Sequence, residues 1–160
     1  MNMAPLPATT RIGHVRLRVA DMQRSLDFYQ RVLGYRIVRY EGNVAHLSPR
    51  QGFPAHFILH EHPGAQPKPK ETTGLYHAAI LLPYRRELAR FLRHLMESAW
   101  PEEGGADHGV SEAIYLRDPD GNGLEVYADR PYQAWPRSDG DLAMTTAPLD
   151  GDSLLAELRE

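Results

Sequence analysis

The chain has no cysteine among its 160 residues. This absence excludes a disulfide framework and metal ligation through thiolates. No apolar run is long enough to span a bilayer. The segment from Met1 to Pro7 has no charged start followed by an apolar block, so we expect no signal peptide. These absences fit a reducing compartment, and we expect a cytoplasmic protein that does not associate with membranes.

The chain also has no cluster of basic residues. Lys and Arg together number 18 against 21 Asp and Glu, which gives a formal net charge of -3 at pH 7. Such a balance gives no reason to expect binding to nucleic acid or another polyanion. The 42% hydrophobic content over this length suits one compact domain with a substantial core.

Two strand-like segments begin with histidine at equivalent places. His14 opens residues 12–19 and His77 opens residues 75–82. When the two segments are aligned, the apolar positions of the helices that follow them also stay in phase, as a structural repeat requires. Any two strand–helix units share an apolar pattern, but that similarity does not explain a histidine at the same place in both.

The pattern of elements predicts an α+β fold built from two βαβββ units. Residues 1–10 form a lead-in, and residues 11–130 form the domain, with the first unit at 11–62 and the second at 75–130. Asp21 is the expected N-cap of a helix that ends near Gly34, and a second helix is predicted over 84–98. We expect a curved mixed sheet, a half-barrel with its helices outside. The extension at 131–160 is expected to end in a short amphipathic helix that either covers its own chain or holds a second copy.

The segment from His108 to Glu125 predicts a β-hairpin that carries reactive side chains. The intervening Asp118-Pro-Asp-Gly-Asn-Gly sequence is dense in turn residues. Such a hairpin places Tyr115 beside Glu125 on one face, with His108 at its entry. Strand alternation puts His14 and His77 on that same concave side. Polar residues on the concave side of a sheet face either solvent or a site.

Together, the double βαβββ pattern over 11–130 and the hairpin resemble the vicinal oxygen chelate superfamily. That superfamily includes glyoxalase I, bleomycin- and fosfomycin-resistance proteins and extradiol dioxygenases. The hairpin is similar to the extradiol dioxygenase signature, although Ala106 departs from it. The matching residues are His108, Ile114, Tyr115, Asp118, Pro119, Gly121 and Glu125. Segments 107–113 and 144–150 look like the N-terminal half of catechol-2,3-dioxygenase-like proteins, which usually carry a second such domain.

The resemblance implies a divalent metal bound by His14, His77 and Glu125. Two imidazoles and one carboxylate leave open positions on the ion, as in non-haem Fe(II) oxygenases. Fe(II) is therefore the expected metal, and Mn, Zn and Ni are alternatives. The expected function is an extradiol dioxygenase that cleaves a catecholic or similar small aromatic substrate with O₂.

The resemblance also implies roles for three further residues. Tyr115 would donate a hydrogen bond to a substrate oxygen, and His108 would lie near dioxygen. His60 occupies about the place of an acid–base histidine, since an imidazole titrates near neutral pH. An exposed strand end explains His60 and His62 equally well.

Two alternative functions remain open from the sequence. A glyoxalase-like metal-dependent isomerase or lyase would take a fourth ligand from residues 56–62, such as Glu61. A non-catalytic drug-binding resistance protein would need no metal, and the complete His14, His77 and Glu125 set argues against it. Single-domain members of this superfamily often pair, so we expect a homodimer.

Overall fold

The computed structural model describes residues 5–7, 9–66, 69 and 73–159. The predicted lead-in at 1–10 therefore lies partly outside the described residues. The first unit contains β1 (Val15–Val19), α1 (Met22–Arg31), β2 (Arg36–Glu41), β3 (Val44–Ser48) and β4 (Phe57–Glu61). The second contains β5 (Ala78–Leu82), α2 (Arg85–Ser98), β6 (Glu102–Asp107), β7 (Ser111–Arg117) and β8 (Gly123–Asp129).

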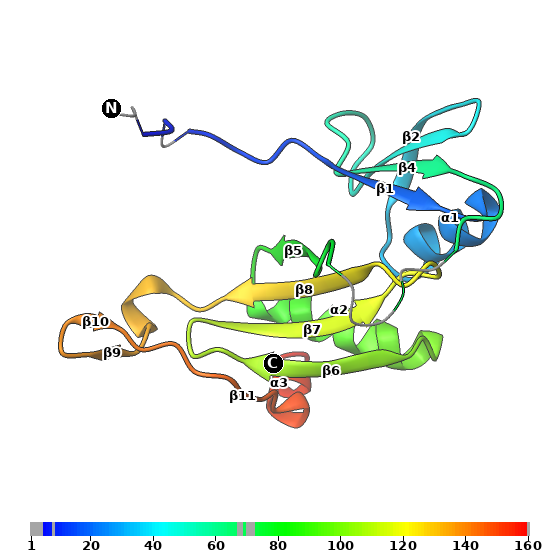
Figure 1. Ribbon diagram of the computed structural model, residues 1–160. Coiled ribbons are helices and arrows are strands. Elements are labelled where there is room, and N and C mark those ends of the chain that lie inside the picture. Colours follow the sequence, from blue (N-terminus) through cyan, green and yellow to red (C-terminus); the bar gives the residue numbers. More distant parts are fainter. Residues whose placement is uncertain (1–4, 8, 67–68, 70–72, 160) are drawn as a thin grey trace.

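The two units have the same strand order, which confirms the predicted α+β fold. Hydrogen bonds order the first sheet β1-β4-β3-β2 and the second β11-β6-β7-β8-β5. In each unit the first strand runs parallel to the last, and the remaining neighbours are antiparallel. The first strands begin at residues 15 and 78 and the first helices at 22 and 85, so both pairs are 63 residues apart. The strands thus form two sheets, one for each unit (Figure 1).

The extension after β8 folds back on its own chain. It contains a 3₁₀ turn (Tyr132–Ala134), the short strands β9 (Arg137–Ser138), β10 (Asp141–Leu142) and β11 (Ala147–Pro148), and helix α3 (Gly151–Ala156). Strand β11 adds to the edge of the second sheet beside β6. Helix α3 packs against α2 (Figure 1). Its Leu154 side chain is completely buried. Of the two arrangements expected for the tail, the structure has the one that covers its own chain.

Two strand boundaries differ from the sequence prediction in a way that matters for the site. Strands β1 and β5 begin at Val15 and Ala78, so His14 and His77 lie immediately before them. Strand β6 is the strand that the βαβββ pattern of the second unit requires before the hairpin, in a stretch whose local sequence is less certain. Gly104 and Gly105 weaken its strand signal, and the register shifts between Glu102 and Gly104.

One hydrophobic core joins the two units. Helix α1 presents Phe28 to Trp100 of the second unit, with ring centroids 4.8 Å apart. The alternation predicted for the strands is confirmed, because Leu17 and Val19 are buried. Asp21 caps α1 as predicted, accepting a hydrogen bond from the backbone N–H of Arg24. Within the described part of the chain, no helix is long and apolar enough to cross a lipid bilayer.

The turn between β7 and β8 attaches the second unit to the first turn of α1. Asp120 Oδ1 accepts hydrogen bonds from the backbone N–H of Ala20 at 2.9 Å and from Arg24 at 2.8 Å. Its Oδ2 lies 3.2 Å from the hydroxyl of Ser25. Since Asp120 and Ser25 are both buried, these bonds replace lost contacts with water.

Asp118 organises the same turn from within. Its Oδ1 accepts from the backbone N–H groups of Asp120 and Asn122, and its Oδ2 accepts from the Tyr29 hydroxyl at 3.1 Å. Burial raises the pKa of Asp118, and the hydrogen bonds it accepts act in the opposite direction. Gly121, at φ 82°, completes the tight turn because a left-handed backbone conformation suits glycine.

We predict that Asp120→Ala lowers the free energy of unfolding by about 2 kcal/mol or more, because it leaves several buried or half-buried donors without an acceptor. Urea denaturation followed by circular dichroism measures this. Asp27→Ala is the matched control: its carboxylate is exposed and 3.7 Å from Arg31, so its loss should change stability by less than about 0.5 kcal/mol. Equal effects of the two substitutions would contradict the role assigned to Asp120.

Candidate active site on the β7–β8 hairpin

The β7–β8 hairpin places Tyr115 directly opposite Glu125. The two residues are register partners in the antiparallel pair. Their neighbours along the strands face the core, as the alternation predicts, and are almost fully buried: Ile114, Leu116, Leu124 and Val126. The Tyr115 hydroxyl donates to Glu125 Oε1 at 3.1 Å. The other face of this hairpin thus carries a linked phenol and carboxylate.

His77 reaches the same carboxylate from its position just before the neighbouring strand, β5. Strand β5 runs parallel to β8 with Ala79 opposite Glu125, which brings the residues just before β5 alongside. His77 Nε2 lies 2.8 Å from Glu125 Oε2, and the two side chains remain 26% and 13% exposed. A small ion or ligand can therefore reach both groups.

Gly123 makes this approach possible. A β-carbon at Gly123 would collide with the carbonyl oxygen of Tyr76 and would lie 3.4 Å from the α-carbon of His77. Only a residue without a side chain lets the segment before β5 pass this close to β8. The sequence indicates only a turn glycine here, so its role in positioning His77 was missed.

His108 joins the network from the turn between β6 and β7. Its Nε2 lies 2.9 Å from the Tyr115 hydroxyl, and its Nδ1 lies 3.2 Å from the backbone oxygen of Thr145. Desolvation, with a smaller effect from the Glu125 charge, raises the pKa of Tyr115 to about 12. Tyr115 therefore remains protonated at neutral pH and keeps a hydrogen to donate.

These four side chains line one cavity of ≈ 540 Å³. It is bounded by aromatic and apolar groups as well as polar ones, which suits a small ring-containing molecule. The remaining lining residues are Tyr76, Ala106, Ser111, Tyr127, Met144 and Thr146. Met144 and Thr146 belong to the C-terminal extension, which no sequence pattern places at the site.

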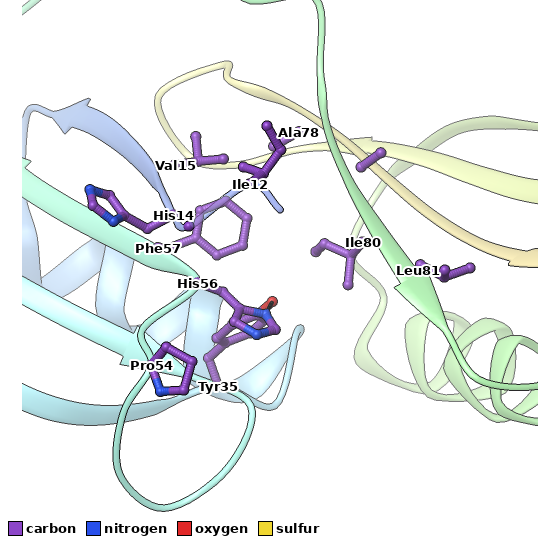
Figure 2. A pocket seen from close by; sticks show the side chains of 12 residues that line it. Ile12, His14, Val15, Tyr35, Pro54, His56, Phe57, Ala78, Ile80 and Leu81 are labelled. Atoms are coloured by element: carbon purple, nitrogen blue, oxygen red, sulfur yellow. Dashed lines mark hydrogen bonds between the residues drawn. The ribbon is translucent and has the colours of Figure 1, made fainter. Parts of the chain in front are cut away.

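The structure does not bring the other two predicted site residues into this cavity. His14 is exposed and lies at the rim of a second cavity of ≈ 330 Å³ between β1 and β5. Figure 2 shows its imidazole pointing away from Ile80 and Leu81 on the opposite wall. His60 lies on β4 in the first sheet, where its ring packs against His62 with centroids 4.5 Å apart. Among the described residues, no group of three His, Asp or Glu side chains is close enough to hold a metal ion.

Comparison with known proteins identifies the class. Residues 11–126 match the model of the Glyoxalase/Bleomycin resistance protein/Dioxygenase superfamily. A catechol-2,3-dioxygenase of Bacillus subtilis (strain 168) is 43% identical over 157 residues, which cover 97% of this chain and 54% of that protein. The chain thus spans about half the length of this relative. A lactoylglutathione lyase of Escherichia coli O157:H7 is 26% identical over 75% of this chain and 93% of its own length.

Solved structures agree on the fold. A glyoxalase/dioxygenase from Nostoc punctiforme superposes with a TM-score of 0.66 at 23% identity, covering 82% of this chain and 99% of that chain. A glyoxylase/bleomycin resistance protein/dioxygenase domain from Frankia sp. EAN1pec gives 0.64 at 22% identity over 77% and 100%. This protein belongs to the Glyoxalase/Bleomycin resistance protein/Dioxygenase superfamily, as its double βαβββ pattern and hairpin motif predict. It is related within that superfamily to catechol-2,3-dioxygenase.

We predict that Gly123→Ala separates His77 from Glu125 and lowers the free energy of unfolding by about 2 kcal/mol or more, because a backbone carbonyl cannot move as a side chain can. Thermal unfolding and the NMR signals of the His77 ring report the two effects. Gly13→Ala is the control, because a β-carbon there meets nothing within 4 Å. An unshifted His77 ring in a folded Gly123→Ala variant would refute this close approach.

Proposed function

We propose that this protein is an extradiol, ring-cleaving dioxygenase that acts on a catecholic or similar small aromatic substrate with Fe(II) and O₂. One observation carries the proposal: His77, Glu125, Tyr115 and His108 meet in one cavity. The similarity to a protein named catechol-2,3-dioxygenase supports it. That relative is almost twice as long as this chain, so we assign its activity to this chain only as a proposal.

The donor set of the cavity fits part of a divalent metal site. His77 and Glu125 offer an imidazole nitrogen and a carboxylate, which Fe(II), Mn(II), Zn(II) and Ni(II) all accept. We propose His14 as the third ligand. It lies in an exposed segment before β1, so that segment must move toward β5 for His14 to join the pair. When bound, Fe(II) would supply open positions for both catechol oxygens and for dioxygen, and would acidify the catechol.

The residues around the pair suit a catechol. Tyr115, held protonated by its raised pKa, can donate to a substrate oxygen where negative charge develops. His108 Nε2 lies 2.9 Å from the Tyr115 hydroxyl and helps to hold it in place, and the His108 ring lines the same cavity. Tyr76, Tyr127 and Met144 provide apolar surface for the ring. The aromatic ring itself supplies the electrons that reduce O₂, so the reaction needs no further reductant. The acid–base role of His60 stays a prediction.

The two alternatives have less support from the contacts. A glyoxalase-like site needs a fourth ligand from residues 56–62, but Glu61 Oε1 already accepts from the backbone N–H of Met22 at 2.7 Å. His56 Nδ1 lies 3.3 Å from the Tyr35 hydroxyl. A drug-binding protein without a metal would have no use for the His77–Glu125 pair. We therefore favour ring cleavage over both.

We predict that His77→Ala and Glu125→Ala each abolish stoichiometric Fe(II) binding and catechol-dependent oxygen uptake, since either change leaves too few ligands. Anaerobic Fe(II) loading, metal analysis and an oxygen electrode with a panel of catechols measure this. Glu97→Ala removes an exposed carboxylate on α2 and is the matched control. Unchanged metal content in both ligand variants would refute the metal site.

Tyr115→Phe should keep the metal and slow turnover roughly tenfold or more, because the variant has no hydroxyl to donate to the substrate oxygen.

We also propose that the protein forms a homodimer through the free edges of β1 and β5. Each strand lies at the edge of its sheet. Ile12 is 88% exposed and Leu81 53% exposed beside these edges, and pairing with a second copy would bury them. We expect light scattering at micromolar concentration to give twice 18.1 kDa, and Leu81→Lys to lower that mass. A monomer mass for the unmodified protein would contradict the proposal.

A further inference from the structure

Residues 143–149, here called the C-terminal strap, run along β6 and the turn that follows it. At one end, the backbone N–H of Ala143 donates to the oxygen of Pro136 at 2.9 Å, and that of Thr145 donates to the oxygen of His108 at 3.2 Å. Strand β11 pairs with β6 in the middle. At the other end, the backbone N–H of Leu149 donates to the oxygen of Gly105 at 3.3 Å. The strap is therefore bonded along its length.

The strap and the segment just before it, which contains Pro136, pack closely against two glycines. A β-carbon at Gly105 would lie 2.6 Å from Leu149 Cδ2 and 2.8 Å from Leu149 Cβ. At Gly109, where φ is 74°, a β-carbon would lie 2.9 Å from Pro136 Cγ. These approaches are closer than side-chain carbons normally make, so the fit depends on the absence of side chains at both positions.

Helix α3 anchors the strap at its C-terminal end. Asp150 caps the helix by accepting from the backbone N–H of Ser153 at 2.9 Å. Arg85 joins the helix to the body of the protein, contacting Glu157 at 2.7 Å and the buried Glu112 at 2.6 Å. A segment fixed at both ends in this way holds its backbone carbonyls in defined places.

One of those carbonyls determines the hydrogen-bonding state of His108. The Thr145 oxygen can only accept, so the 3.2 Å contact requires the hydrogen of His108 to be on Nδ1. In a neutral ring, Nε2 then carries the lone pair and can accept the Tyr115 hydroxyl hydrogen at 2.9 Å. This is the same hydrogen that Glu125 Oε1 accepts at 3.1 Å, so the two acceptors compete for it. With the opposite tautomer, His108 would donate to Tyr115 and the Thr145 contact would be lost. Nδ1 would then accept from the Thr146 hydroxyl at 3.4 Å, a longer contact than the 3.2 Å bond to the Thr145 carbonyl.

We propose that the C-terminal strap is a positioning element of the active site, in which the Thr145 carbonyl fixes the His108 tautomer that faces Tyr115 while Met144 and Thr146 form a wall of the same cavity. The contribution to turnover rests on the proposed function. The tautomer itself does not, because it follows from contacts within the chain.

The direct test is ¹⁵N NMR of the histidine side chains at a pH where the rings are neutral, with His108→Asn used to assign the His108 signals. We expect the hydrogen on Nδ1 in the unmodified protein. An unrestrained neutral imidazole prefers to carry its hydrogen on Nε2. A hydrogen found on Nε2 of His108 in the unmodified protein would therefore overturn the proposal by itself.

Gly105→Ala tests the dependence on the strap, because its β-carbon must push Leu149 away. We expect the His108 hydrogen to move to Nε2 and kcat for catechol cleavage to fall roughly tenfold or more, with a folded protein shown by circular dichroism. Retention of the Nδ1 tautomer after the strap has moved would overturn the proposal.

Two substitutions serve as controls. Gly151→Ala lies in the same extension, where a β-carbon makes only an ordinary 3.8 Å contact with Leu92 Cδ2. Thr145→Ala keeps the backbone carbonyl. Both should leave the tautomer unchanged, and a shift in Thr145→Ala would show that the side chain rather than the carbonyl holds His108. If the protein cleaves no catechol but the tautomer follows the strap, the proposed function fails and the positioning role stands.

Discussion

The buried carboxylates of the β7–β8 turn are the contact on which the rest of this structure depends. Asp120 accepts from the start of α1, and Asp118 accepts from Tyr29 in the last turn of that helix. The same hairpin carries Tyr115 and Glu125 farther along its strands. The turn that joins the two units therefore also fixes the strands of the site, so damage to it should affect stability and site geometry together.

Much of the fold could be predicted from the sequence because its signals are local and repeated. Apolar periodicity, the Asp21 cap and the turn residues of the hairpin each act over a few residues, and their phase repeats at a spacing of 63. The placement of Glu125 beside Tyr115 follows from strand alternation alone. The βαβββ pattern requires a strand before the hairpin, but the bounds and pairing of β6 could not be predicted, because its two glycines carry no strand preference and its pairing with β7 and β11 comes from tertiary contacts.

The site was predictable only in part, for a related reason. His77 approaches Glu125 because Gly123 leaves room for the Tyr76 carbonyl, and no local pattern reports such a backbone approach. The strap reaches His108 from 37 residues away along the chain. Alternation places His14 on the concave side, but the residue lies ahead of β1, where no ladder bond controls its direction. Sequence pattern thus predicts the chemical character of each site residue more reliably than it predicts which residues from different elements come into contact.

The proposed ring cleavage requires a metal held by the His77–Glu125 pair, with His14 as the proposed third ligand. A crystal structure of the protein loaded anaerobically with Fe(II) tests this most directly. We predict an ion bound to His77 Nε2 and the Glu125 carboxylate, with the segment before β1 moved so that His14 completes the set. An ion bound elsewhere, or loaded protein in which His77 Nε2 still bonds the Glu125 carboxylate directly with no ion coordinated by either group, would contradict it.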